Sequence, residues 1–270
     1  MLYCLSKPFS EALHVLEGTK FKNVEIVDEG LHSLNEERVD AIRKIAYDRD
    51  LEISVHSPFI NVDIASISYQ RRRASLRRLK KSILLSGKLE SPLWVLHSGL
   101  RNDSSRLFSD VNWKMNLRSI RELIEFAKIH GVRVTVENGV SNLHFILSSV
   151  EDFNRFYDDL GEYELGLTLD VGHANIDGEI FKFLKEYAGK IVHAHLHDNH
   201  GVSDEHLGIG DGNINWVRVI QAFKEIGYKG ALIVESERDV SRSLSRLMRL
   251  VKEANDPDQR ATFQVEHRGS

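Results

Sequence analysis

Residues 165–173 read LGLTLDVGH, a short apolar run that ends at an acidic residue before a glycine and a histidine. Similar runs rich in Val, Ile and Leu recur along the chain, separated by mixed segments that suit amphipathic helices. We predict strands at 2–5, 24–27, 53–56, 93–97, 132–137, 165–170, 191–197 and 231–235. We predict helices at 33–48, 69–85, 113–129, 143–157, 179–187, 214–226 and 240–252, with Gly131 as a left-handed cap after one of them.

This alternation of strands and helices predicts a parallel (β/α)8 TIM barrel of the α/β class, because each parallel strand needs a crossover helix before the next. A doubly wound open sheet is the alternative, but it normally carries a glycine-rich turn after the first strand, and this chain has none there. We find no repeat or linker, so we predict a single barrel domain over residues 1–253. Residues 254–270 are expected to form a polar C-terminal tail, either flexible or partly vector-derived.

Composition excludes several classes of protein. The 270 residues include one cysteine, which rules out a disulfide scaffold and predicts a cytoplasmic protein. No run of about 18 uncharged apolar residues is present, and the N-terminal MLYCLSKPF does not resemble a secretory signal, so we expect no membrane association. A net charge of −4 argues against a generally basic, nucleic-acid-binding surface. The oligomeric state stays open.

The ends of six successive predicted strands carry residues that bind cations or transfer protons. In a barrel of this type the active site lies at the carboxyl ends of the strands. With 40 Asp and Glu and 13 His among 270 residues, six such ends would arise by chance with a probability on the order of 10⁻⁴. The six residues are His56, His97, Glu137, Asp170, His195 and Glu235.

Each of these residues alone is as well explained by a capping or hydrogen-bonding role. Together, carboxylates and imidazoles that converge on one barrel mouth need a cation to offset their repulsion and desolvation. We therefore predict a divalent metal site rather than a purely structural cluster. Mixed imidazole and carboxylate ligands suit Zn²⁺, Mn²⁺, Co²⁺ or Fe²⁺ better than Ca²⁺.

Two neighbouring motifs extend this site. Asp170 and His173 stand three residues apart in DVGH, and both are expected to face the mouth. Strand alternation places His193, His195 and His197 on one side, so His193 should lie one layer deeper in a core or supporting role. The stretch that follows also offers His200, Asp204 and His206, and we expect His197 and His200 to be loop residues.

These residues resemble those of the xylose-isomerase-like barrel superfamily, which joins sugar and sugar-phosphate isomerases and epimerases to abasic-site nucleases of the endonuclease IV type. The resemblance covers the second to the eighth predicted strand. In the epimerase branch one divalent ion, commonly Mn²⁺, is held at the positions of Glu137, Asp170, His195 and Glu235. In the nuclease branch three zinc ions are held by nine residues, which here are His56, His97, Glu137, Asp170, His173, His195, Asp204, His206 and Glu235.

The residues around these positions separate the two branches. The nuclease typically reads DTCH, HPG and HAPY where this chain reads DVGH, HSGL and HSPF. Glu25 in NVEIVDEG looks like the isomerase pattern, although an ordinary solvent-facing Glu is an equal alternative. In contrast, DEH at 204–206 matches the nuclease DRH motif. The resemblance thus implies one to three ions, Zn²⁺ or Mn²⁺.

We expect a metal-dependent sugar or sugar-phosphate isomerase or epimerase that acts by proton transfer through a metal-stabilised enediolate. Glu137 and Glu235 would be the catalytic acid and base. Substrate contacts are expected from Glu25, His56, His173 and His197.

The alternative is a zinc-dependent abasic-site nuclease, which alone would make nucleic acid a partner. Such an enzyme needs cationic residues around the mouth to hold DNA. The basic run at 71–81 is the one candidate, and we interpret it as a solvated helix face. A binding protein without catalytic activity is a third, less favoured class.

Overall fold

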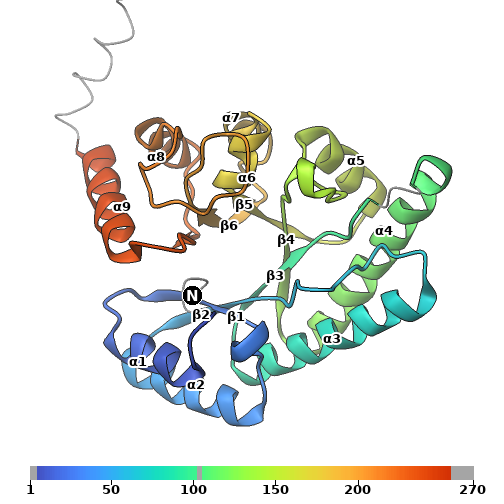
Figure 1. Cartoon of the computed structure of the whole chain (residues 1–270), viewed down its shortest axis with the longest axis horizontal. Helices are drawn as coiled ribbons and strands as arrows, with labels where there is room; N and C mark the ends of the chain where they lie inside the picture. Colours follow the sequence, from blue (N-terminus) through green and yellow to red (C-terminus); the bar gives the residue numbers. More distant parts are fainter. Residues whose placement is uncertain (1–4, 102–104, 257–270) are drawn as a thin grey trace, which may run out of the picture.

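The computed structural model describes residues 5–101 and 105–256, and these form one α/β barrel (Figure 1). Seven parallel strands pair in chain order, and β1 and β7 at the two edges lie near each other, so the sheet nearly closes. The strands are β1 (Asn23–Val27), β2 (Glu52–His56), β3 (Leu93–His97), β4 (Arg133–Glu137), β5 (Gly166–Asp170), β6 (Ile191–Leu196) and β7 (Ala231–Val234).

Helices surround the strands on the outside of this barrel (Figure 1). In the described part of the chain they are α1 (Phe9–Gly18), α2 (Glu36–Arg49), α3 (Tyr69–Lys88), α4 (Ser105–Ile129), α5 (Val150–Leu160), α6 (Val171–Ile176), α7 (Ile180–Glu186), α8 (Trp216–Glu225) and α9 (Val240–Asn255). None of the helices described is both long and apolar enough to cross a bilayer.

The TIM-barrel prediction is confirmed, and seven of the predicted strands are present with nearly the predicted bounds. The run at 2–5 falls mainly outside the described residues, and Leu5 lies in a turn. Gly131 has the predicted positive φ, at 69°. The chain also contains α1 and α6, which the sequence pattern did not predict.

The predicted helix at 143–157 begins later than expected. The segment Ser141–Leu143 is a separate 3₁₀ turn, and α5 starts only after Ser149. The Ser149 hydroxyl accepts a hydrogen bond from the Asp152 amide at 3.2 Å, while the Asp152 carboxylate accepts one from the Ser149 amide at 3.1 Å. This capping box fixes the start of the helix.

Alternation along the strands separates an apolar core from a polar barrel interior. In β4, Val134 and Val136 are buried in the apolar cluster that the helices cover. Thr135 and Glu137 point to the other side, and the Thr135 hydroxyl lies 3.1 Å from that of Thr168 on β5. The apolar layer between sheet and helices therefore stabilises the fold, and the barrel interior is left to polar groups.

The long segment between β6 and α8 folds around the buried carboxylate of Asp198. One carboxylate oxygen accepts hydrogen bonds from the amides of Asn199 and Ile214, at 2.9 and 3.2 Å. The other accepts bonds from the Gly210 amide at 2.8 Å and the Trp216 indole at 2.7 Å. A single side chain thereby shapes the loop in which two of the predicted metal ligands lie.

Replacement of this carboxylate should destabilise the protein. We expect Asp198→Ala to lower the free energy of unfolding by about 2–5 kcal/mol, because buried donors lose their acceptor. Urea denaturation followed by circular dichroism measures the change. Asp211→Asn is the matched control in the same loop, since its ion pairs with Arg242 and Arg246 are partly exposed and should contribute less than about 1 kcal/mol. Equal losses in the two variants would contradict the central role of Asp198.

Candidate functional site

The six residues predicted at strand ends meet at one mouth of the barrel. His56, His97, Glu137 and Asp170 are the last residues of β2 to β5. His195 lies near the end of β6 and Glu235 directly after β7. The structure therefore brings together all six groups from separate strands.

Four of these residues form what we name the primary cluster: Glu137, Asp170, His195 and Glu235. One ligand atom from each lies within 4.8 Å of the others. The Nδ1 atom of His195 is 3.0 Å from Glu137 Oε1, 3.5 Å from Glu235 Oε1 and 4.0 Å from Asp170 Oδ2. Three buried carboxylates around one imidazole are a donor set that fits a divalent cation.

Two oxygens of this cluster support the same interpretation. Asp170 Oδ2 is buried without a hydrogen-bond partner in the part of the chain that the structure describes, and the nearest donors to Glu137 Oε2 given by the structure are imidazole nitrogens at 3.3 and 3.4 Å. A carboxylate oxygen buried in this way is costly unless a cation or another donor reaches it. The cluster thus has the free coordinating atoms that a metal requires.

A second group is joined to the first through Glu137. The Nε2 atoms of His56 and His97 lie 3.3 and 3.4 Å from Glu137 Oε2. The other ring nitrogen of His56 is 2.8 Å from the carbonyl oxygen of Ser57, which orients Nε2 toward the carboxylate. Glu137 can therefore bridge two ligand groups.

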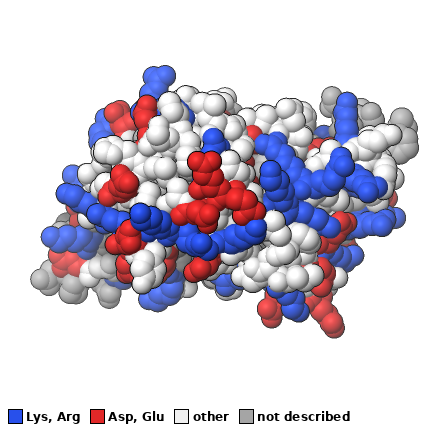
Figure 2. Space-filling view, turned by 90° about the horizontal axis from the view of Figure 1, so that it is seen from below, with Lys and Arg blue, Asp and Glu red and all other residues white. Residues whose placement is uncertain are grey.

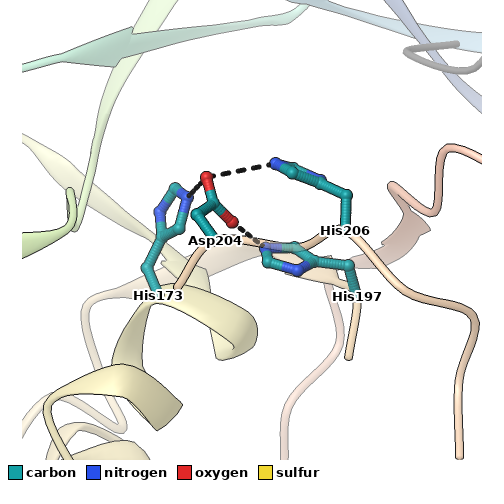
Figure 3. A group of neighbouring side chains, drawn as sticks. All are labelled: His173, His197, Asp204 and His206. Carbon is teal, nitrogen blue, oxygen red and sulfur yellow. Dashed lines mark ion pairs between the residues drawn. The ribbon is translucent and has the colours of Figure 1, made fainter. Parts of the chain in front are cut away.

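The third group consists of His173, His197, Asp204 and His206, drawn in Figure 3. The Asp204 carboxylate lies among the three imidazoles, which come from α6, from the residue directly after β6 and from the loop that follows (Figure 3). Its Oδ2 atom is 3.4 Å from His173 Nε2 and 3.3 Å from His206 Nε2. The structure therefore gathers all nine positions named in the resemblance, and it adds His197 to them.

Glu25 lies beneath these groups. Its carboxylate oxygens are 3.0 Å from His195 Nε2 and 2.9 Å from His193 Nε2, and it also accepts a hydrogen bond from Ser54. Glu25 is 1% exposed, so it is not an ordinary solvent-facing Glu. From this position Glu25 can hold the His195 ring through the Nε2 atom. His193 lies beside Glu25, one layer deeper in the barrel.

The two loop histidines differ from each other. His197 directly follows the last residue of β6, as the predicted loop position requires, but its side chain is fully buried. His200 is exposed and pairs with Glu205 at 3.0 Å. The His197 ring packs against Gly172 and stacks on the His206 ring, whereas His200 is exposed three residues further along the chain.

Charges at the mouth shift the acid–base behaviour of its groups. Burial alone would raise the pKa of the Glu137 carboxyl, but the surrounding imidazoles hold this pKa well below its ordinary value. Burial opposes protonation of His173, yet the carboxylates of Asp170 and Asp204 raise its pKa to about 10. Burial likewise opposes protonation of His206, but the Asp204 carboxylate raises the pKa of His206 to about 9. The carboxylates thus favour the charged form of these two imidazoles, and a bound cation would compete with the protons for the same ring nitrogens.

Sequence reasoning missed the side chains that hold the ligands in place. Asn138 follows Glu137 and forms a pair of hydrogen bonds with the backbone of Asp170, at 2.8 and 3.0 Å. Asp198 has the equivalent function for the loop of Asp204. Asn138 directly follows the last residue of β4 and Asp198 lies two residues beyond β6, and this nearness to strand ends is the signal in the sequence that pointed to them.

Three residues of the basic run of α3 have the following partners within the protein. Arg78 pairs with the buried Glu29 at 2.5 Å, and Lys80 pairs with Glu122 at 2.7 Å. Arg73 donates a hydrogen bond to the Tyr69 hydroxyl at 2.8 Å. Figure 2 looks onto the side where α2 and α3 lie and shows acidic residues interleaved with the basic ones. This arrangement agrees with a solvated helix face.

Comparison with known proteins assigns the family. The family model described as xylose isomerase-like TIM barrel matches residues 14–259. The chain belongs to this family. The relatives of this xylose isomerase-like chain include Uncharacterized protein MJ1311 of Methanocaldococcus jannaschii, which is 29% identical over 261 residues, or 94% of this chain and 89% of the relative.

Other family relatives have descriptions that name an activity. A crystal structure described as a D-tagatose 3-epimerase-like protein is 28% identical, with a TM-score of 0.88, and the match covers 93% of this chain and 96% of that one. A probable endonuclease 4 of Mycobacterium leprae is 24% identical over 186 residues, or 66% of this chain and 70% of the relative. Both branches of the resemblance are therefore represented among the relatives.

The primary cluster leads to a direct test of metal binding. We expect chelator-treated protein to bind Mn²⁺, and Asp170→Asn and Glu235→Gln each to weaken this binding by more than about 100-fold through loss of a carboxylate ligand. Electron paramagnetic resonance of free Mn²⁺ measures the affinity. Glu237→Gln is the control, because this exposed residue lies two positions beyond Glu235. Unchanged affinity in both cluster variants would exclude the primary cluster as a metal site.

Proposed function

We propose that the protein is a divalent-metal-dependent sugar or sugar-phosphate isomerase or epimerase. The observation that carries this proposal is the primary cluster, in which three carboxylates and one imidazole are buried together at the carboxyl ends of the strands. The similarity to a D-tagatose 3-epimerase-like protein supports a small sugar as the substrate. The ion would be Mn²⁺ or Zn²⁺, held by Glu137, Asp170, His195 and Glu235.

The chemistry needs a proton to leave a carbon atom next to a carbonyl group. The bound ion would stabilise the negative charge that develops on the neighbouring oxygen atoms. Glu137 on β4 and Glu235 after β7 approach the mouth from separate strands, which suits one group that removes the proton and another that returns it. The surrounding imidazoles hold the pKa of Glu137 below its ordinary value, which keeps its carboxylate ionised as a metal ligand requires.

The remaining mouth residues would bind and orient the sugar. His56 and His173 each have one ring nitrogen fixed by a backbone carbonyl, at 2.8 Å in both cases, and the other lies 3.3 Å from Glu137 in His56 and 3.4 Å from Asp204 in His173. An apolar pocket beside His97, lined by Phe59 and Phe145 among others, provides a surface for the carbon face of a sugar. We assign Glu25 to positioning His195 rather than to direct substrate contact.

An abasic-site nuclease is the second candidate, and a specific observation favours it. All nine residues of the three-zinc pattern are gathered in three groups, with Glu137 shared between two of them. Against it, Arg78 and Lys80 of the basic run pair with acidic residues of the same chain. The isomerase or epimerase remains our proposal.

One assay separates the two candidates. We expect the metal-loaded protein to convert at least one member of a panel of ketoses, aldoses and sugar phosphates, and to leave abasic duplex DNA uncut. Glu137→Gln and Glu235→Gln should each lower turnover by about 10²–10⁴-fold, the usual contribution of a general acid or base. Glu237→Gln should retain activity. Incision of the DNA without conversion of any sugar would contradict the proposal, and near-native turnover in either Gln variant would remove that residue from the mechanism.

A further inference from the structure

A partly open apolar pocket of about 90 Å³ lies beside His97 at the mouth of the barrel. Its walls come from the end of β3 and from the loops after β2, β3 and β4. Two half-buried aromatic residues, Phe59 and Phe145, form part of the wall, together with aliphatic residues such as Val62 and Leu100. Ligand sites are typically concave and mostly apolar in this way, which makes the pocket a candidate for part of the substrate.

The aromatic wall is continuous with the histidines of the mouth. The Phe145 ring stacks on the His97 imidazole, with centroids 5.1 Å apart and planes inclined by 28°. The Phe59 ring meets His56 edge-on at 5.5 Å. A Cβ atom at Gly139 would lie 2.3 Å from Phe145 Cγ, so glycine at this position is what allows the ring to lie there. The pocket therefore begins directly behind two of the residues that face the primary cluster.

Hydrogen bonds of the backbone fix the walls of the pocket. The Phe59 amide and the amide after it donate to the Glu29 carboxylate, each at 3.0 Å. The Leu100 amide donates to Asp63 at 3.2 Å, and Leu100 pairs with Phe145 across an antiparallel bridge. The three loops are thus tied to one another and to neighbouring segments. The pocket is pre-formed, as sites for small molecules usually are.

The polar side chains of the lining are buried or already hydrogen-bonded. The Ser57 hydroxyl and the Nδ1 atom of His97 are shielded from solvent. The other ring nitrogen of His97 lies 3.4 Å from Glu137. The Ser98 hydroxyl donates to the carbonyl of the following residue at 3.2 Å and accepts a bond from the Leu147 amide at 3.1 Å. A hydroxyl group placed in the pocket would therefore lose its water without gaining a new side-chain partner, which is unfavourable.

The lining also has no positive charge. No Lys or Arg is among the described residues that line the pocket. Arg101 follows the lining residue Leu100, but its guanidinium donates to the carbonyl of Ile146 at 3.0 Å and pairs with Asp152. A phosphate group would have to give up its hydration here with no cation to replace it, at a high cost in free energy. The pocket therefore suits neither a phosphorylated nor a hydroxylated chain end.

We propose that this pocket receives the methyl end of a deoxy sugar, so that the substrate is an unphosphorylated sugar with an apolar terminal carbon. The inference rests on the proposed isomerase or epimerase function and names its substrate class. His97 links the two regions, because its Nε2 atom lies 3.4 Å from Glu137 Oε2 while the residue also lines the pocket. A sugar that reacts beside Glu137 extends past His97, and burial of its terminal methyl group is favourable without any polar partner.

A calorimetric binding series tests this assignment on the metal-loaded protein. The probes are D-tagatose, 6-deoxy-D-tagatose and D-tagatose 6-phosphate. We expect the 6-deoxy sugar to bind about 10-fold or more tighter than D-tagatose, and more than about 100-fold tighter than the phosphate, because the latter two carry a polar end that the pocket leaves unpaired. Weaker or equal binding of the 6-deoxy sugar, or binding of none of the three, would overturn the proposal. Calorimetry detects binding with or without conversion, whereas failure of the proposed function shows as absence of turnover.

A charge introduced into the pocket should reverse this preference. Lysine at Leu100 would supply the missing cation, so we expect Leu100→Lys to shift the ratio of the two affinities by about 10-fold or more toward the 6-phosphate over the 6-deoxy sugar. Leu143→Lys is the matched control, because Leu143 is 52% exposed and outside the lining. It should keep the ratio of the parent. An unchanged ratio in folded Leu100→Lys would contradict the assignment, and the series on the parent protein decides the question without any variant.

Discussion

Repulsion among buried carboxylates is the constraint on which the mouth of this barrel depends. Glu137, Asp170 and Glu235 lie around one imidazole at depths where water does not screen them. A parallel barrel brings the carboxyl ends of all its strands to one rim, so acidic strand ends necessarily converge there. Histidines on neighbouring strands supply part of the opposite charge, and bound cations would supply the rest. The charge of the residue at one strand end therefore limits which residues are tolerated at the other strand ends.

Side chains outside the ligand groups hold this arrangement in place. Asn138 ties the end of β4 to the backbone of Asp170, and Glu25 lies behind the His195 ring. Asp198 gathers four donors from its own loop and so places Asp204 and His206. In each case a buried polar group is satisfied by hydrogen bonds to neighbouring segments. The geometry of the site is thus a product of the loops as much as of the strands.

The sequence predicted the strands and the site residues at their ends because both follow from local patterns. Apolar runs mark buried parallel strands, and the residue that ends each run is visible without knowledge of tertiary contacts. The burial of His197 and of Glu25 follows instead from contacts between residues far apart in the sequence, with Asp170 on β5 and with His193 on β6. Helix α6 was missed because six residues that begin directly after a strand give no helical periodicity.

The polar groups at the mouth are linked to one another through shared side chains. Glu137 belongs to the primary cluster and also lies 3.3 and 3.4 Å from the Nε2 atoms of His56 and His97. His173 likewise lies between Asp170 of the primary cluster and Asp204 of the following loop. A change at one of these residues therefore alters the surroundings of the others. The same barrel mouth can thus carry the residue pattern of a nuclease while the two carboxylates that suit the proposed proton transfer, Glu137 and Glu235, lie together in the primary cluster.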